Sequence, residues 1–208
     1  MSAMYRPPFT GVDDDAEIRS FVAEVAAGEV VTSGHDGFPR STRLPLVWRE
    51  DLLIAHFARA NDHWREIADG SPVLVIVGGI EGYVSPSWYA SKREHGRVVP
   101  TWNYESAQIR GRARVIEDPD WLRGAVTALT EAHERRRPDS WEVSDAPERF
   151  VEGQLRGIVG LEIRIEDVAA KAKLSQNRSA ADRQGVVEGL DASDDPRDQI
   201  LAERMRRV

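Results

Sequence analysis

The sequence predicts a mainly β protein with added helices, in the α+β class: an antiparallel, closed or half-closed β-barrel with peripheral helices and a helical C-terminal tail. Two observations carry this prediction. Several segments alternate apolar and polar residues with period two, and the turns between the first of them are too short for crossover helices, which favours antiparallel pairing. The chain of 208 residues, 41% hydrophobic, is also long enough for one sizeable core. We therefore expect a single domain over residues 1–208, with residues 174–208 as a helical extension.

The first elements are an amphipathic helix and three strands. Residues 13–28 show helical periodicity, with three aspartates at the start and Gly28 as the expected stop. The period then changes to two in the segments 29–33, 40–48 and 52–57, with a hairpin turn at Asp36-Gly37 between the first two. Pro45 predicts that the second of these strands lies at a sheet edge or contains a bulge.

The remaining elements follow in order. Asn61 is expected to cap a short helix that ends at Gly70, and the apolar run 72–79 is expected to be a central strand buried on both faces. Residues 80–97 predict a long loop, and long loops in compact domains are usually functional. The last elements are a strand at 98–117, a helix after Asp118-Pro119, a helix at 147–157, a strand at 158–174, and two helices separated by Asp194-Asp195-Pro196.

Composition narrows the class of function. The chain has no cysteine, no apolar run long enough to span a membrane and no signal-like start, so we expect a cytoplasmic protein without membrane contact. The net charge is −7, from 28 basic and 35 acidic residues. DNA-binding domains usually carry a basic surface, so direct DNA binding is poorly supported, although Arg135-Arg136-Arg137 is a local basic run.

The common catalytic signatures are absent. The chain contains no GxxxxGK[ST] loop and no GxSxG elbow, and the glycines at 78–82 lack the spacing of a dinucleotide loop. Its five histidines are scattered, so we predict no metal site. No residue stands out as a general acid or base, and the catalytic residues, if the protein is an enzyme, stay unassigned.

Four segments are rich in groups that bind anions and planar rings. Residues 56–64 (HFARANDHW) leave a strand and open a helix, where backbone N–H groups and an arginine suit a phosphate. Residues 85–89 (SPSWY) and 99–104 (VPTWNY) combine aromatic and polar side chains, as a flat heteroaromatic ring requires. Residues 173–178 (KLSQNR) place four hydrogen-bonding side chains before a helix. Each segment also has a purely structural interpretation: a helix cap or an aromatic packed at a barrel end.

In this order and spacing, HFARANDHW, YVSPSWY, VVPTWNY and KLSQNR resemble the PaiB-type proteins, the FMN-binding negative transcriptional regulator family. The segments MYRPPF (4–9) and RGIVGLEI (156–163) extend the resemblance, which runs from about Met4 to Leu190. It implies a split barrel of the pyridoxamine-phosphate-oxidase-like kind that is a homodimer with FMN between the subunits, each site drawing on both chains. Many split-barrel oxidases have a lysine near position 63, and His63 departs from this pattern.

The resemblance implies a set of cofactor-binding residues. The phosphate would be held at the strand-to-helix region, and the residues near 102 and 177 would contact the ring or the partner subunit. The candidates are Thr42, Arg43, His56, Arg59, Asn61, His63, Thr101, Trp102, Asn103, Gln176, Asn177 and Arg178.

Three functions stay open at this point. The first is an FMN-binding regulator, acting through a protein partner or through the redox state of the flavin. The second is an oxidoreductase that uses FMN or F420 on a small molecule, since the flavin carries the chemistry and the protein supplies position and electrostatics. The third, a haem-binding split barrel, depends on His56 and His63 alone.

Overall fold

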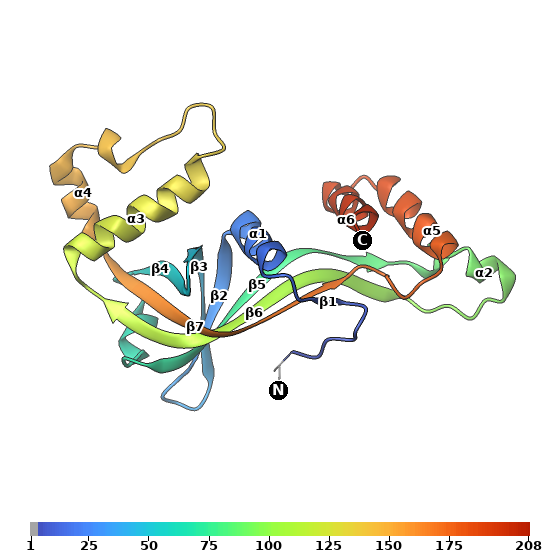
Figure 1. The fold of residues 1–208 in the computed structure, drawn as a ribbon, viewed down its shortest axis with the longest axis horizontal. Helices are drawn as coiled ribbons and strands as arrows, with labels where there is room; N and C mark the ends of the chain where they lie inside the picture. The colour runs from blue at the N-terminus through green and yellow to red at the C-terminus, as the bar shows by residue number, and fades with distance from the viewer. Residues whose placement is uncertain (1–3) are drawn as a thin grey trace. The chain divides into compact units, whose positions relative to one another are not determined.

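The computed structural model describes residues 4–208, and residues 1–3 of the predicted domain lie outside the described part. Strands supply the framework, as the alternating sequence pattern predicts (Figure 1). The elements are β1 (Gly11–Val12), α1 (Asp15–Val25), β2 (Ala27–Ser33), β3 (Pro39–Arg49), β4 (Leu52–Ala58), η1 (Asp62–Glu66), β5 (Ser71–Val84), η2 (Pro86–Trp88), α2 (Ser91–Glu94), β6 (Thr101–Ile116), α3 (Pro119–Glu134), η3 (Val143–Asp145), α4 (Glu148–Leu155), β7 (Ile158–Lys173), α5 (Ala180–Asp191) and α6 (Pro196–Arg206).

The described strands form an antiparallel ring. Their order is β1-β7-β4-β3-β2-β5-β6, and an additional pairing of β7 with β6 closes the ring, so that β1 alone lies outside it. The short turns after β2 and β3 bring consecutive strands together, as the hairpin signals predict. The predicted barrel with flanking helices is therefore confirmed.

Of the two alternatives predicted from Pro45 for strand β3, an edge position or a bulge, the edge position is wrong. The strand lies between β2 and β4 and is not an edge strand. Pairing with β2 ends at the Ala27–Pro45 pair, whereas pairing with β4 begins at the Leu46–Ala55 pair. The proline therefore sits where the strand changes partner, and a missing backbone N–H costs little there.

Three predicted boundaries are wrong. Helix α1 ends at Val25, and Ala26 makes the turn with a φ of 51°, so Gly28 lies inside β2 and is not the stop. The segment after Asn61 forms only the 3-10 turn η1 and does not reach Gly70. Strand β5 continues to Val84 within the predicted loop, and its buried residues alternate with partly exposed ones, so it is not buried on both faces.

The capping signals identify helix starts more reliably. The Asp118 carboxylate accepts a hydrogen bond from the Trp121 N–H at 2.8 Å, and Pro119 begins α3, as predicted. Asp195 caps α6 in the same way, with Pro196 at the first helical position. The predicted break between the two C-terminal helices is therefore confirmed.

The residues group into two compact units. One comprises residues 15–77 and 108–168 and contains β2, β3, β4, α1, α3 and α4; we call it the barrel unit. Its interior includes Phe57, Val75 and Val159, each fully buried, and a smaller apolar cluster between α3 and α4 centred on Leu122 and Leu155. The prediction of one domain over residues 1–208 stays a prediction.

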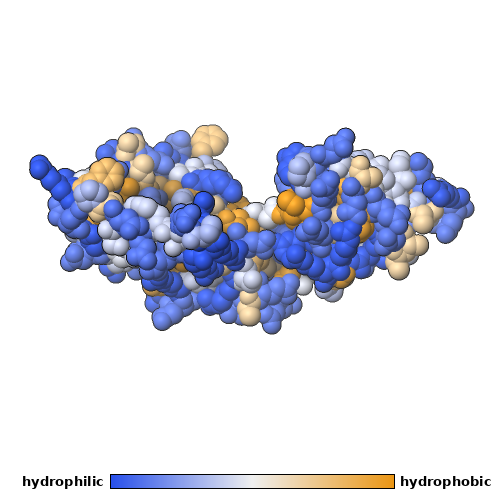
Figure 2. All heavy atoms as spheres, turned by 90° about the horizontal axis from the view of Figure 1, so that it is seen from above, coloured by the Kyte–Doolittle hydropathy of each residue, from blue (hydrophilic) through white to orange (hydrophobic). Residues whose placement is uncertain are grey.

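The other unit comprises residues 4–14, 78–107 and 169–208 and contains α5 and α6; we call it the C-terminal unit. The two helices pack against the ends of strands β5 and β7 through an apolar core that includes Val84, Leu174, Leu190 and Leu201. The face seen in Figure 2 is mostly hydrophilic with scattered apolar spots, as a chain with 30% charged residues would produce.

Candidate functional site

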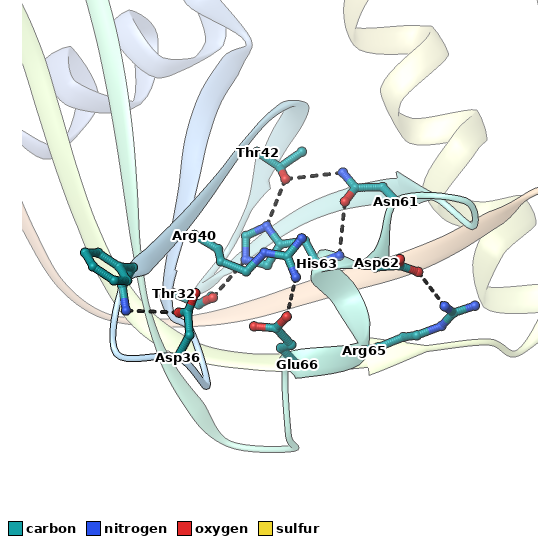
Figure 3. A network of polar contacts seen from close by, with 10 residues as sticks. Thr32, Asp36, Arg40, Thr42, Asn61, Asp62, His63, Arg65 and Glu66 are labelled. Carbon is teal, nitrogen blue, oxygen red and sulfur yellow. Dashed lines mark hydrogen bonds and ion pairs between the residues drawn. The ribbon is translucent and has the colours of Figure 1, made fainter.

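Three of the predicted site residues meet in a polar cluster inside the barrel unit (Figure 3). His63 is 1% exposed and hydrogen-bonds through both ring nitrogens, Nδ1 to Thr42 Oγ1 and Nε2 to Thr32 Oγ1, each at 2.8 Å. Asn61 Nδ2 donates to the same Thr42 hydroxyl at 3.2 Å, and Asn61 Oδ1 accepts from the His63 N–H at 3.1 Å. The cap of η1 thus fixes the histidine between two strands.

The surroundings of His63 favour the neutral form of its imidazole. Burial lowers the pKa of His63, the nearby Arg40 guanidinium lowers it further, and Glu66 acts in the opposite direction. Arg40 and Glu66 form an ion pair with each other (Figure 3). A neutral imidazole has one donor and one acceptor nitrogen, so one threonine hydroxyl donates to it and the other accepts from it.

The neutral, buried histidine predicts acid sensitivity. The pKa of His63 is lower in the folded chain than the ordinary value of 6.5, so the unfolded chain takes up a proton first as the pH falls. Its contribution to stability is complete above pH 6.5 and is lost as the pH falls through the folded pKa. Urea unfolding at about pH 8 and about pH 5 should show a smaller acid-induced loss in His63→Gln than in the wild type. The exposed control His35→Gln should keep the wild-type loss; equal losses in all three proteins would contradict this role of His63.

Arg59 is occupied by the protein itself. Its Nε donates to the Arg156 carbonyl at 2.9 Å, its Nη2 donates to the Ile158 carbonyl at 3.1 Å, and its Nη1 pairs with Glu117. The guanidinium therefore ties the end of β4 to the start of β7. It also lines a cavity of about 530 Å³, whose lining includes four carboxylates and three guanidinium groups and so is not one-sided in charge.

The two other candidates in the barrel unit are separate from the His63 cluster. Arg43 is exposed on β3, where Nη1 lies 3.4 Å from Glu29 Oε1. His56 has a buried Nδ1 without a hydrogen-bond partner among residues 4–208. Burial lowers the pKa of His56, and the backbone of Phe57 raises it by a smaller amount. His56 lines a mostly apolar cavity of about 240 Å³ between α3, α4 and β7.

A second group of predicted residues meets in the C-terminal unit. Asn103 is fully buried; its Nδ2 donates to Ser175 Oγ at 3.0 Å, and Ser175 Oγ donates back to Asn103 Oδ1 at 3.1 Å. Thr101 Oγ1 and the Trp102 carbonyl both accept from Lys173 Nζ. Segments 99–104 and 173–178, singled out separately in the sequence, are therefore neighbours.

The side chains of the KLSQNR segment have two kinds of surroundings: some bond to the backbone of the segment, and others line a cavity. Gln176 folds back on the backbone, where Oε1 accepts from the Leu174 N–H at 2.7 Å and Nε2 donates to the Ala172 carbonyl at 2.6 Å. Asn177 and Arg178 line a small cavity, and the Arg178 guanidinium lies 4.8 Å from the centre of the Tyr89 ring.

Sequence reasoning missed several residues of these groups. Thr32 and the Arg40–Glu66 pair lie in ordinary strand and helix positions, and nothing in their local pattern marks them. Lys171 is 7% exposed and lines the same cavity as Asn177. The available sequence signal was a lysine between two alanines, Ala170 and Ala172, in the last strand, since a lysine is rarely fully buried unless paired.

Within residues 4–208, no three histidine, aspartate or glutamate side chains are close enough together to hold a metal ion. Over the same residues, no helix has the length and apolar character needed to cross a membrane.

The arrangement defines a class: an antiparallel barrel with flanking helices whose polar clusters present hydroxyl, amide and cationic groups. Solved structures with a similar fold include two proteins whose names refer to a flavin. A FAD and haem binding protein from Mycobacterium smegmatis matches with a TM-score of 0.61 at 19% identity, covering 86% of this chain and 80% of that one. A flavocytochrome from Azotobacter vinelandii matches with a TM-score of 0.56 at 16% identity, covering 95% of this chain and 78% of that one. At these identities the matches establish the fold.

The sequence comparisons establish the family. Residues 4–167 match the family model described as "Putative FMN-binding domain". The protease synthase and sporulation protein PAI 2 of Bacillus subtilis is 36% identical over 206 residues, 97% of this chain and 96% of that protein. The chain therefore belongs to this FMN-binding family, its resemblance to PaiB-type proteins is confirmed, and FMN is its cofactor.

Proposed function

We propose that this protein is an FMN-containing regulator of the PaiB type, which acts through a protein partner or through the redox state of its flavin. The observation that carries the proposal is the similarity to PAI 2, which extends over nearly the whole of both chains and so includes the C-terminal helices. When bound, FMN supplies one- and two-electron chemistry, and the protein supplies binding and orientation.

Charge pairing on the C-terminal helices argues against direct contact with DNA. The arginines of α6 are engaged within the chain: Arg197 pairs with Asp195, Arg204 with Glu105, and Arg206 with Asp191. Together with the net charge of −7, this leaves α6 without the basic face that phosphate contacts require. A regulatory role is then better served by a protein partner.

A complementation experiment tests this role. The chain would be expressed in a Bacillus subtilis strain that lacks PAI 2, with extracellular protease and sporulation as the readouts that the relative's name suggests. We expect both phenotypes to return towards wild type. A variant of the chain that no longer binds FMN should not restore them. Expression of the folded, flavin-loaded chain without any change in either phenotype would contradict the proposed role.

We further propose that the protein is a homodimer in which each flavin contacts both chains. The candidate residues support this because they fall into two groups, one around Thr42 and Asn61 in the barrel unit and one around Thr101 and Arg178 in the C-terminal unit. One flavin would take the first group from one protomer and the second from its partner.

Mixing two defective variants tests the shared site. Asn61→Ala and Arg178→Ala proteins would be unfolded together, refolded and titrated with FMN. If each site uses both chains, random mixed dimers restore about a quarter of the wild-type sites. Retention of the parental defects in the mixture, with dimers present by sedimentation, would rule out sharing.

Arg59 is the residue proposed to hold the flavin phosphate, and Arg59→Ala should weaken FMN binding by about 1–3 kcal/mol if this contact is charge-assisted. The exposed Arg65→Ala is the matched control, because Arg65 pairs with its neighbour Asp62 and lies against Trp64. Fluorescence titration gives the affinity, and thermal unfolding reports the lost contacts to β7. Weaker stability with unchanged FMN affinity would make Arg59 purely structural.

The second candidate function is a flavin-dependent oxidoreductase. Trp102 favours it: this side chain is 47% exposed on β6, and its indole N–H donates to Glu81 at 3.1 Å, which leaves an aromatic face available to a small substrate. Sustained turnover of flavin-loaded protein with NAD(P)H or reduced F420 and a panel of acceptors would establish it. Reduction of the flavin without turnover would leave the regulator as the better account.

A further inference from the structure

The C-terminal unit contains a small cavity formed by segments far apart in the sequence. Its volume is about 150 Å³, and the N-terminal MYRPPF segment forms one side of it. It is lined by Tyr5, Pro7, Phe9, Thr10, Thr101, Asn103, Lys171, Lys173, Ser175, Asn177 and Arg178. This volume is below the roughly 300–1,000 Å³ typical of pockets for whole drug-sized ligands, so it suits a single compact group.

The charge of the lining is one-sided. Three cations, Lys171, Lys173 and Arg178, face the cavity, and no carboxylate lines it. None of the three forms an ion pair within residues 4–208. Outside the lining, Arg178 helps to lower the pKa of Asp182, whose carboxylate accepts from the Ser91 N–H and hydroxyl. The lining itself therefore concentrates positive charge in a small, partly desolvated volume.

Hydrogen bonds hold the two lysines in place, and each ammonium group has at least one N–H donor left for a ligand. Lys171 Nζ donates to the Tyr5 carbonyl at 3.2 Å and lies 5.5 Å and 5.2 Å from the ring centres of Tyr5 and Tyr104. An ammonium group has three donors, so this single hydrogen bond leaves Lys171 able to bind a further acceptor. Burial lowers the pKa of Lys173, and the charges of Lys171 and Arg178 lower it further while Tyr104 opposes them. A bound anion would relieve this repulsion.

The backbone at the cavity is strained. Ser175 has a φ of 64°, in the left-handed region that residues other than glycine rarely adopt. The buried Asn103 amide holds the Ser175 hydroxyl through the two reciprocal hydrogen bonds described above. Strain of this kind persists where the surroundings enforce it, and it is concentrated at ligand sites. Here it places Asn177 and Arg178 at the cavity instead of continuing β7.

We propose that this cavity binds an oxyanion, a phosphate or carboxylate group, held by the ammonium groups of Lys171 and Lys173 and by Arg178. The group is either the phosphate of FMN, which Arg59 then does not hold, or part of a separate small molecule that binds beside the flavin. The first alternative, the FMN phosphate, rests on the proposed function. The second, a separate small molecule, does not.

Calorimetric titration with inorganic phosphate, in a buffer free of other oxyanions, tests the site without flavin. Lys173→Met keeps the length of the half-buried side chain and removes its charge, and we expect phosphate to bind at least about tenfold more weakly, a loss typical of a charge-assisted contact. Lys171→Met should act in the same way. Lys92→Met is the matched control, because Lys92 is an exposed lysine in the same unit that does not line the cavity. Thermal unfolding of each variant separates lost binding from lost folding, and Lys173→Arg should restore binding.

Parallel titrations with FMN and riboflavin identify the source. If the oxyanion is the flavin phosphate, Lys173→Met weakens FMN binding and leaves riboflavin binding unchanged. If a separate molecule is bound, the variant loses phosphate and keeps both flavins. Lys173→Met and Lys171→Met proteins that fold and bind both phosphate and FMN as the wild type does would overturn the proposal. Phosphate binding by a protein that binds no FMN would contradict the proposed function and leave this site standing.

Discussion

Phe57→Ala is expected to lower the free energy of unfolding by about 3–5 kcal/mol, the range for loss of a large buried aromatic side chain. Phe57 is fully buried on β4, opposite Val159 of β7. Its ring meets that of His63 edge to face, with 5.4 Å between the ring centres. The substitution therefore leaves a cavity in the barrel core and removes the support of the polar cluster.

Urea unfolding monitored by circular dichroism measures this effect. The matched control is Phe38→Ala, whose side chain is 73% exposed in the turn between β2 and β3 and should change stability by about 0.5 kcal/mol or less. Similar effects of the two substitutions would show that Phe57 does not occupy the core.

Gly111→Ala should destabilise the barrel by about 3 kcal/mol, at the upper end of the usual range for overpacking. A Cβ at this position of β6 would lie 2.3 Å from the Arg164 carbonyl oxygen and 2.8 Å from Ile163 Cγ2, both in β7. The nearer obstacle is backbone, so relief would require the strands to separate where β6 and β7 close the ring.

Gly124→Ala provides a control with the opposite sign. Gly124 lies in α3 with open space around its Cα, so an added methyl group meets no atom within 4 Å. Alanine should raise the stability of the helix by about 0.5–1 kcal/mol. Thermal unfolding of both variants gives the comparison, and a Gly111→Ala protein as stable as the wild type would contradict the β6–β7 closure.

The fold could be predicted from local patterns in the sequence. Alternation, short turns and caps such as Asp118-Pro119 identify the strands and helices, because each depends on residues within one turn of the chain. The misplaced boundaries depend on distant partners. Pro45 is tolerated inside a sheet because β2 and β4 exchange at that residue, and β5 is long because β2 and β6 extend its pairing.

The candidate site could be predicted in part for the same reason. Hydroxyl and amide residues near strand ends are visible in the sequence, and Thr42, Asn61 and His63 do come together. The cost of burying polar groups decides what they do there: His63 uses both ring nitrogens within the protein, and Arg59 gives three of its five N–H donors to two carbonyls and Glu117. Lys171 was missed, and Lys173 lies in the KLSQNR segment but was not among the candidate residues, because the role of both lysines arises only when residues 4–10 and 101–103 fold against them.

Binding of FMN can be measured by fluorescence titration of FMN with the purified, flavin-stripped protein. We expect saturable quenching of the flavin fluorescence with one FMN for each chain, and weaker binding of riboflavin, which lacks the phosphate. FMN that stays free and fully fluorescent in the presence of excess folded protein would contradict this expectation.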